Sequence, residues 1–202
     1  MTQATKSVGI FVFDGVEPLD TVGPFEAFLC AETDDEEALF DVFLLAETRA
    51  PVTATGGLIM TPRHGFGDLP SLEILLVPGG AGTRTLTKRQ DITSWLKQRH
   101  AETDLTLSVC TGAQVLAAAG LLKGRKATTH WATYDWLRAI EPDVDVQEGA
   151  RYVDNGDIIC SSGVSAGIDM ALFVIERLHG ADVAARAARS MEYEYWPQGR
   201  VA

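Results

Sequence analysis

Residues 105–122 read LTLSVCTGAQVLAAAGLL, and this stretch decides the fold. Leu105–Val109 is short and rich in apolar and β-branched residues, which predicts a strand. The small and apolar run Ala113–Leu122 predicts the helix that follows. Only Cys110, Thr111 and Gly112 remain between the two elements. The chain must therefore pass from strand to helix through a sharp turn with a cysteine at its start.

Other apolar segments alternate between the two kinds of structure along the first half of the chain. We expect strands at Val8–Phe13, Asp41–Ala46 and Glu73–Val77, helices at Thr21–Ala31 and Lys88–Arg99, and irregular or hairpin structure over residues 50–70.

The second half repeats the pattern in smaller pieces. We expect a short strand over residues 127–131, a helix at Ala132–Ile140, a hairpin at Tyr152–Cys160 turning at Asn155–Gly156, and an apolar helix at Ser165–Leu178. Ser165 is expected to cap this last helix and Gly180 to end it. Alternating strands and helices predict an α/β fold, one domain over residues 1–202 around a mostly parallel sheet.

Length and charge exclude several classes of protein. A chain of 202 residues fits one hydrophobic core. Its net charge of −11 opposes a nucleic-acid partner, because phosphate binding needs clustered Lys and Arg. No apolar run reaches the ~20 residues of a membrane helix. The four histidines lack metal-ligand spacing, and the acidic run 32–37 lacks the glycine of a calcium loop, so no metal or cofactor is expected.

Cysteine usage points to a compartment. The N-terminal MTQATKS leads straight into the first strand and does not resemble a signal peptide. Three cysteines, with no CxxC pair, indicate free thiols in a reducing cytoplasm. Cys30 and Cys160 lie inside apolar segments and are interpreted as packing residues. Cys110 alone follows a strand directly.

Functional groups collect beyond the carboxyl ends of parallel strands, and three such ends are informative. A strand, a sharp turn and a helix would lift Cys110 above the sheet as a nucleophile. The N–H groups that open the next helix favour its thiolate form.

The glycines after Val77 form a second strand end. The sequence PGGAGT matches neither a dinucleotide fingerprint nor a phosphate loop. Gly79 and Gly80 would instead let bare backbone approach a reacting atom, and the N–H groups of Gly80 and Thr111 would form an oxyanion hole. The alternative is a plain tight turn.

Asp20 follows the first strand and is the expected proton partner of Cys110, with Glu17 as the other candidate. A carboxylate next to a thiol raises the thiol pKa, so the two groups would share one proton and shuttle it during addition of water across a bond. The alternative for Asp20 is a helix N-cap.

The segments IFVFDGVEPLDTVGP, LLVPGGAGT, SVCTGAQVLAAAGLLKGRKATTHW and SSGVSAGIDMAL, in this order, resemble the ThiJ/PfpI superfamily, which is related to class I glutamine amidotransferases. Within it, the chain looks most similar to two groups, the isocyanide hydratases and, to an equal degree, the sensor half of AraC-type regulators. The resemblance implies a flavodoxin-like three-layer sandwich, a homodimer and a small-molecule substrate.

The resemblance also implies roles for individual residues. Cys110 matches the nucleophile, Thr111 the residue after it, Asp20 the acid/base carboxylate, and Val164 a pocket wall near the nucleophile. It implies a metal-free reaction in which water is added to R–N≡C through a thioimidate, giving an N-substituted formamide. Peptidase relatives carry His where Thr111 stands, which argues against proteolysis, and His130 is expected to be structural.

Two alternatives accompany the hydratase. One is a ligand- or redox-sensing module without turnover, although no basic helix-turn-helix follows Ala202. The other is a glyoxalase-like, carbonyl-detoxifying enzyme, whose relatives pair the cysteine with Glu. The C-terminal MEYEYWPQGRVA departs from the longer tail of the superfamily, and Tyr195 and Trp196 are interpreted as core or interface residues.

Overall fold

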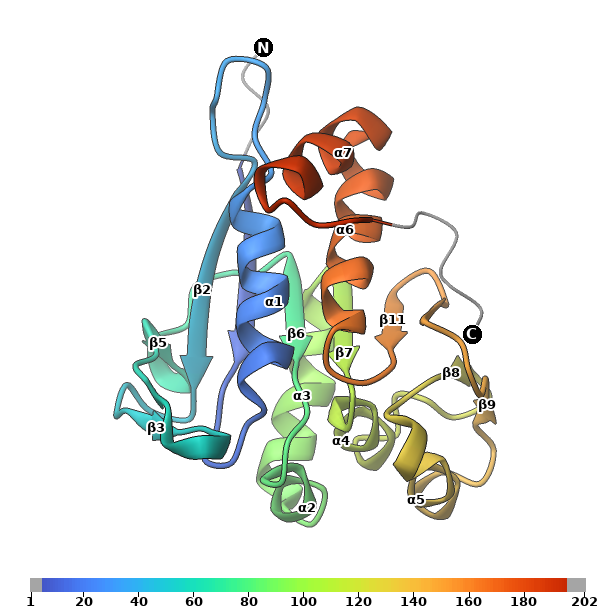
Figure 1. Cartoon of the computed structure of the whole chain (residues 1–202). Helices are drawn as coiled ribbons and strands as arrows, with labels where there is room; N and C mark the ends of the chain where they lie inside the picture. The colour runs from blue at the N-terminus through green and yellow to red at the C-terminus, as the bar shows by residue number, and fades with distance from the viewer. Residues whose placement is uncertain (1–4, 196–202) are drawn as a thin grey trace.

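A computed structural model describes residues 5–195 of the protein (Figure 1). Its centre is a sheet of seven strands in the order β10-β11-β7-β6-β1-β2-β5. Every neighbouring pair is parallel except the β10–β11 hairpin at one edge, so the prediction of a mostly parallel α/β sheet is confirmed. The strands are β1 Lys6–Phe11, β2 Phe40–Ala46, β5 His64–Gly65, β6 Ile74–Val77, β7 Leu105–Val109, β10 Tyr152–Asp154 and β11 Ile158–Ser161.

Successive side chains of the central strands point to opposite faces of the sheet and build a core on each face. Leu75 and Val77 of β6 point into one apolar cluster, and Ile74 and Leu76 point into the other. All four side chains are at most 1% exposed. The sequence of such a strand is a continuous run of apolar residues because both of its faces are covered.

Helices cover both faces and complete a flavodoxin-like three-layer sandwich. Helices α1 Pro18–Leu29, α6 Ala166–His179 and α7 Ala181–Ser190 lie on the face toward the viewer in Figure 1. The opposite layer consists of α2 Thr83–Leu86, α3 Gln90–Glu102, α4 Gly112–Ala118 and α5 Tyr134–Ile140. Among the described residues, none of the helices has the length and apolar character needed to cross a bilayer.

Several element boundaries differ from the expectation. Helix α1 begins at Pro18 rather than Thr21, because proline fits the first helical position. Helix α4 ends at Ala118, four residues early, and Gly120 follows with a φ of 75° that a helix cannot continue. Helices α2 and α7 were not predicted.

The peripheral segments have the type of structure that was expected, namely hairpins and irregular turns. Residues 50–70 hold the β3–β4 hairpin (Val52–Thr53 and Ile59–Met60), β5 and two short 3-10 turns, Thr55–Gly57 and Phe66–Asp68. The β10–β11 hairpin turns at Asn155–Gly156, where Gly156 has a φ of 90°. Gly180, with a φ of 93°, ends α6 as predicted.

The segment 126–146 is arranged differently from the prediction. The strand expected over 127–131 shrinks to β8 Lys126–Ala127, which pairs with an unpredicted strand, β9 Asp145–Val146. A 3-10 turn, Trp131–Thr133, then precedes α5. Ser165 occupies the N-cap position of α6, but its side chain makes no cap hydrogen bond.

Strand order reverses between β1 and β6, and this reversal positions the site. The chain leaves β1 toward β2 on one side, whereas β6, β7 and β11 follow on the other. In open α/β sheets, ligands bind in the crevice at such a switch point, outside the carboxyl ends of the strands. The segments with Asp20, Gly79, Cys110 and Val164 each follow one of these strand ends.

Substitution of Leu76 by Ala should destabilise the protein strongly. Leu76 is fully buried in the central strand, so its loss leaves a cavity between sheet and helices. We expect the free energy of unfolding in urea to fall by about 2–5 kcal/mol. The matched control is Leu29→Ala, because Leu29 is 49% exposed and should change stability by less than about 0.5 kcal/mol. Equal effects of the two substitutions would contradict the assignment of this core.

Candidate functional site

Cys110 occupies the sharp turn between β7 and α4. Its backbone has a φ of 55°, a left-handed conformation that is unusual for a residue with a side chain. The Cys110 N–H points to the carbonyl oxygens of Ser161 and Ser162, each at 3.2 Å, which ties the turn to the end of β11. Gly112 completes the turn, since a Cβ there would collide with the carbonyl oxygen of Val77. Backbone strain that is held in place this way is typical of functional sites.

Asp20 lies in the first turn of α1 and is fully buried. Its Oδ2 accepts a hydrogen bond from the Gly79 N–H at 2.9 Å. Its Oδ1 is buried without a conventional hydrogen bond, and the Cys110 side chain is the polar group beside the carboxyl. The N-cap alternative is wrong, because Glu17 holds the N-cap position. The structure therefore brings the Cys110 and Asp20 side chains together.

The glycines after β6 allow this close approach. A Cβ on Gly79 would lie 2.7 Å from Asp20 Oδ2 and 2.6 Å from the Thr111 nitrogen, so no larger residue fits. A plain tight turn would not by itself require a glycine at position 79, whereas the close approach of Asp20 and Thr111 does. The Gly80 N–H donates to Thr111 Oγ1 at 2.9 Å. In this arrangement the Gly80 N–H is engaged, and its role in an oxyanion hole remains a prediction.

Burial sets the protonation of the pair. Desolvation raises the pKa of Asp20 to about 7, although the Gly79 N–H opposes the shift. Desolvation and the charge of Asp20 raise the pKa of Cys110 to about 12, and hydrogen bonds from the Thr111 and Val164 N–H groups oppose this shift. Of the two opposing influences expected on the Cys110 pKa, the helix end that favours thiolate is outweighed by burial and by Asp20, which raise the pKa. One proton is retained between the two groups over a wide pH range.

Cys110 opens into a cavity of about 320 Å³ above the sheet edge. Although the residue is only 6% exposed, its side chain lies on the cavity wall and is not sealed in the core. The wall consists of Glu17, Gly80, Ala81, Thr83, Arg84, Cys110, Thr111, His130, Trp136 and Val164. Val164, with a φ of 50°, forms part of this wall.

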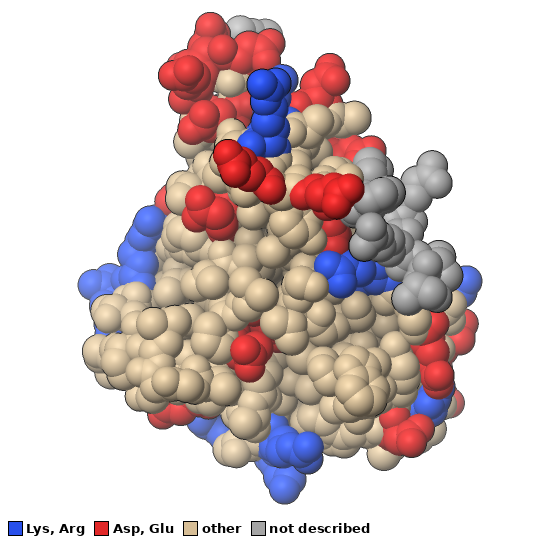
Figure 2. Space-filling view, viewed as in Figure 1, with Lys and Arg blue, Asp and Glu red and all other residues tan. Residues whose placement is uncertain are grey.

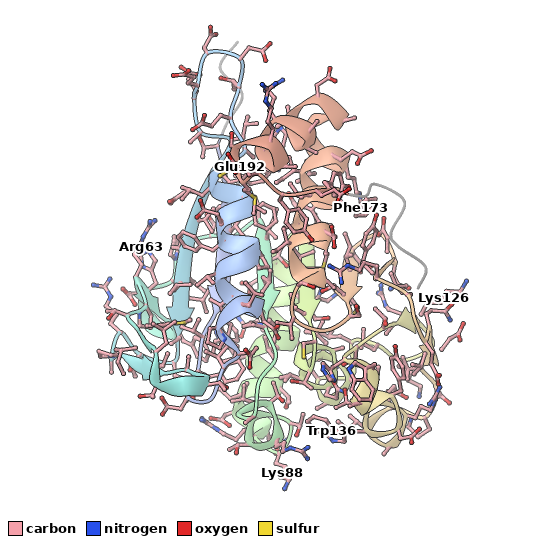
Figure 3. All side chains as sticks on the ribbon, viewed as in Figure 1. Arg63, Lys88, Lys126, Trp136, Phe173 and Glu192 are labelled. Atoms are coloured by element: carbon pink, nitrogen blue, oxygen red, sulfur yellow. The ribbon has the colours of Figure 1, made fainter. Side chains whose placement is uncertain are left out.

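Several wall residues were missed by the sequence analysis. Thr83 Oγ1 donates to the Gly80 carbonyl at 2.7 Å and lies 3.1 Å from Thr111 Oγ1, which fixes the glycine turn. Arg84 and Trp136 come from α2 and α5, and Figure 3 shows Trp136 between these two helices at the lower edge. Neither residue belongs to a motif that a single sequence reveals.

His130 has a structural contact and also a place on the cavity wall. Its Nδ1 accepts a hydrogen bond from the Ala132 N–H at 3.2 Å and caps the turn before α5. Its ring packs so closely on Gly163 that a Cβ there would lie 2.5 Å from it. This backbone contact is of the kind expected for a structural histidine.

The other two cysteines have surroundings different from those of Cys110. Cys160 is fully buried in the core, and Cys30 is half-buried at the end of α1. All three cysteines are free. Within residues 5–195, no three His, Cys, Asp or Glu side chains gather in a group that could hold a metal ion. Tyr195 packs on the core and donates to Glu176 at 3.0 Å, whereas Trp196 lies outside the described residues.

Sequence comparison places the chain among known proteins. It is 36% identical over 186 residues to the isonitrile hydratase of Pseudomonas putida. The aligned residues cover 92% of this chain and 78% of the relative. It is 28% identical over 189 residues to the transcriptional regulator GbdR of Pseudomonas aeruginosa. That match covers 94% of this chain but only 51% of the regulator, so the chain spans about half of the regulator's length.

Solved structures show the same fold. A ThiJ/PfpI family protein from Pseudomonas syringae superimposes with a TM-score of 0.85 at 31% identity, over 96% of this chain and 78% of that one. Drosophila melanogaster DJ-1beta superimposes with a TM-score of 0.83 over 95% of this chain and all of its own, but at 17% identity it supports the fold alone. Residues 6–177, which include the whole Cys110 site, match the DJ-1/PfpI family. The chain belongs to the DJ-1/PfpI family.

Proposed function

We propose that the protein is a cysteine-dependent hydratase that converts an isocyanide into an N-substituted formamide. The observation that carries this proposal is the buried Cys110–Asp20 contact at the base of an open cavity. The 36% identity to an isonitrile hydratase supports the substrate class. The proposal is supported by a thiol and a carboxyl group in contact, which could act as nucleophile and proton carrier, and by space for a small substrate.

The first half of the reaction uses the shared proton. The Cys110 sulfur adds to the terminal carbon of the isocyanide while Asp20 takes up the thiol proton. Asp20 then delivers that proton to the same carbon, giving a neutral thioimidate, Cys110–S–CH=N–R. A carboxyl group with a pKa of about 7 suits both steps, because it accepts and returns a proton at neutral pH with little free-energy cost.

The second half adds water. Asp20, ionised again, removes a proton from a water molecule as the water oxygen attacks the thioimidate carbon. Proton transfer to nitrogen and cleavage of the C–S bond release the formamide and restore the Cys110 thiol. The sum is one isocyanide and one water giving one formamide, with no oxidant or reductant. The Thr111 N–H lies beside the sulfur and would donate to charge that develops during attack. The Gly80 N–H would join it only once released from Thr111 Oγ1.

A sensing module without turnover is the second candidate. The similarity to a transcriptional regulator favours it, because the same fold there forms about half of a longer chain. A glyoxalase-like reaction ranks below both. Its relatives pair the cysteine with Glu, whereas here Asp20 contacts Cys110 and Glu17 lines the cavity wall.

A homodimer is proposed together with the hydratase. Leu19 and Val22 on α1 are 38% and 44% exposed, and Leu58 and Ile59 on the adjacent β3–β4 hairpin are 48% and 59% exposed. The hairpin is joined to the start of α1 by a hydrogen bond from the Thr55 N–H to the Val16 carbonyl. Figure 2 shows this face almost free of charged side chains. Two chains of net charge −11 repel least through such a face.

Turnover of an isocyanide should depend on Cys110. With para-nitrophenyl isocyanide, the wild-type protein is expected to form the formamide, and Cys110→Ala should lose at least about 10³-fold in kcat/KM, because no other group replaces the nucleophile. Cys30→Ala is the matched control and should retain wild-type activity, since Cys30 lies outside the cavity. Absence of turnover by the wild type would contradict the hydratase and favour the sensing module.

The pH profile should report the shared proton. Removal of the first proton from the pair, near pH 7, produces the reactive form, and the second proton leaves only near pH 12. We therefore expect kcat/KM to rise with pH up to about 7 and then to stay level to at least about pH 10. Asp20→Asn should abolish this rise and lower kcat/KM by about 10²-fold or more. A rate that falls as the pH passes 7 would show that the doubly protonated pair is the active form.

Val22→Asp should weaken the dimer, because a new charge on each copy would be buried against the other. Sedimentation velocity should then show a shift from dimer to monomer. The control is Ala185→Asp, an equally new charge on the exposed surface of α7. A wild-type protein that sediments as a monomer at micromolar concentration would refute the proposed interface.

A further inference from the structure

Arg84 is a cation without a carboxylate partner on the wall of the Cys110 cavity. Within residues 5–195, every arginine except Arg84 and Arg189 forms a salt bridge with a carboxylate. Arg189 lies on α7, outside this cavity, whereas Arg84 lines it. In a chain with 28 acidic and 17 basic residues, an unpaired guanidinium beside a reactive site is unusual. Its hydrogen-bonding capacity is available to a ligand.

Trp136 holds this guanidinium in place. The Arg84 guanidinium carbon lies 5.1 Å from the centre of the Trp136 ring, within the range of a cation–π contact. Such a contact orients the planar guanidinium but leaves the donors at its edge unused. Because Arg84 comes from α2 and Trp136 from α5, the pair joins two elements that enclose the cavity. The cation is therefore preorganised before a ligand arrives.

The cavity has an acidic side and a basic side. Glu17, next to the start of α1, is the only acidic side chain on the cavity wall as described, and its charge acts on Asp20. Arg84 stands on the α2 and α5 side, and Lys88, one turn further along, is also exposed without a salt bridge (Figure 3). The rest of the wall consists of small, apolar and hydroxyl residues, His130 and Trp136. A ligand with its reactive end at Cys110 and an anionic end at Arg84 matches this distribution.

We propose that Arg84, held by Trp136, binds a carboxylate on the substrate, so that the preferred substrates are isocyanides that carry a carboxylate group. This inference rests on the proposed function and specifies its substrate class. Guanidinium and carboxylate groups form paired, charge-assisted hydrogen bonds. The interaction orients the substrate, and the chemistry at Cys110 and Asp20 is unchanged.

The kinetic test compares two isocyanides that differ only in charge, 4-isocyanobenzoate and its methyl ester. The wild type should show a kcat/KM at least about ten-fold higher for the carboxylate, the ratio expected from one charge-assisted contact. In Arg84→Met this ratio should fall to about one, mainly through a higher KM for the carboxylate. Arg189→Met, which removes the other unpaired arginine, should keep the wild-type ratio. These results would separate a local contact from the effect of net charge.

A binding test does not require turnover. The reaction products, 4-formamidobenzoate and its methyl ester, are titrated by calorimetry into the Cys110→Ala protein. The carboxylate is expected to bind at least about ten-fold more tightly, and addition of Arg84→Met should remove the preference. If the wild type hydrates neither isocyanide, the hydratase proposal fails, and this measurement still decides whether Arg84 binds carboxylates.

Either of two outcomes would overturn the inference. The first is equal affinity of the Cys110→Ala protein for the carboxylate and the ester. The second is a preference for the carboxylate that survives Arg84→Met, which would assign recognition to another group. Arg84 is exposed, so its replacement is not expected to affect folding, and circular dichroism of each variant checks this.

Discussion

The site depends on one contact, between the Cys110 thiol and the buried Asp20 carboxyl. In water these groups would ionise independently, but in this pocket desolvation raises the pKa of each, and the charge of one opposes ionisation of the other. The pair therefore keeps one proton at neutral pH. A thiol that stays protonated at rest and passes its proton to a neighbour during attack suits addition to a neutral carbon, where a free thiolate would leave the carbon without a proton source.

The fold provides this contact through backbone, not through further charged side chains. Asp20 is held by the Gly79 N–H, and the Cys110 sulfur by the N–H groups of Thr111 and Val164. These three backbone segments follow β6, β7 and β11, whose carboxyl ends lie at the same edge of the sheet. Because the strands are buried on both faces, they cannot shift relative to one another without breaking the core. The precision of the site is thus a consequence of strand register.

The sequence predicts the parts of this arrangement that are local. The run Leu105–Val109 and the small residues after Cys110 predicted the strand, the turn and the helix because each depends on neighbouring residues. The meeting of Cys110 with Asp20 followed from the rule that strand ends share an edge. The sequence indicated two opposing influences on the Cys110 pKa, the helix end and the Asp20 carboxylate, and it did not decide between them because the extent of burial is not visible in sequence. Arg84 and Trp136 were missed for the same reason, since only the packing of α2 beside α5 makes them neighbours.

Burial of Asp20 also affects stability. Its pKa is raised from 3.8 to about 7, so the folded state retains a proton that the unfolded chain loses, and ionisation at higher pH opposes folding. The cost is absent below pH 3.8, grows as the pH rises, and is complete above about 7, where it is on the order of 4 kcal/mol. A carboxyl that served only packing would be better replaced by an amide or an apolar residue. Its place beside a strained cysteine, under a glycine that admits no side chain, fits the proposed proton transfer better than a role in stability.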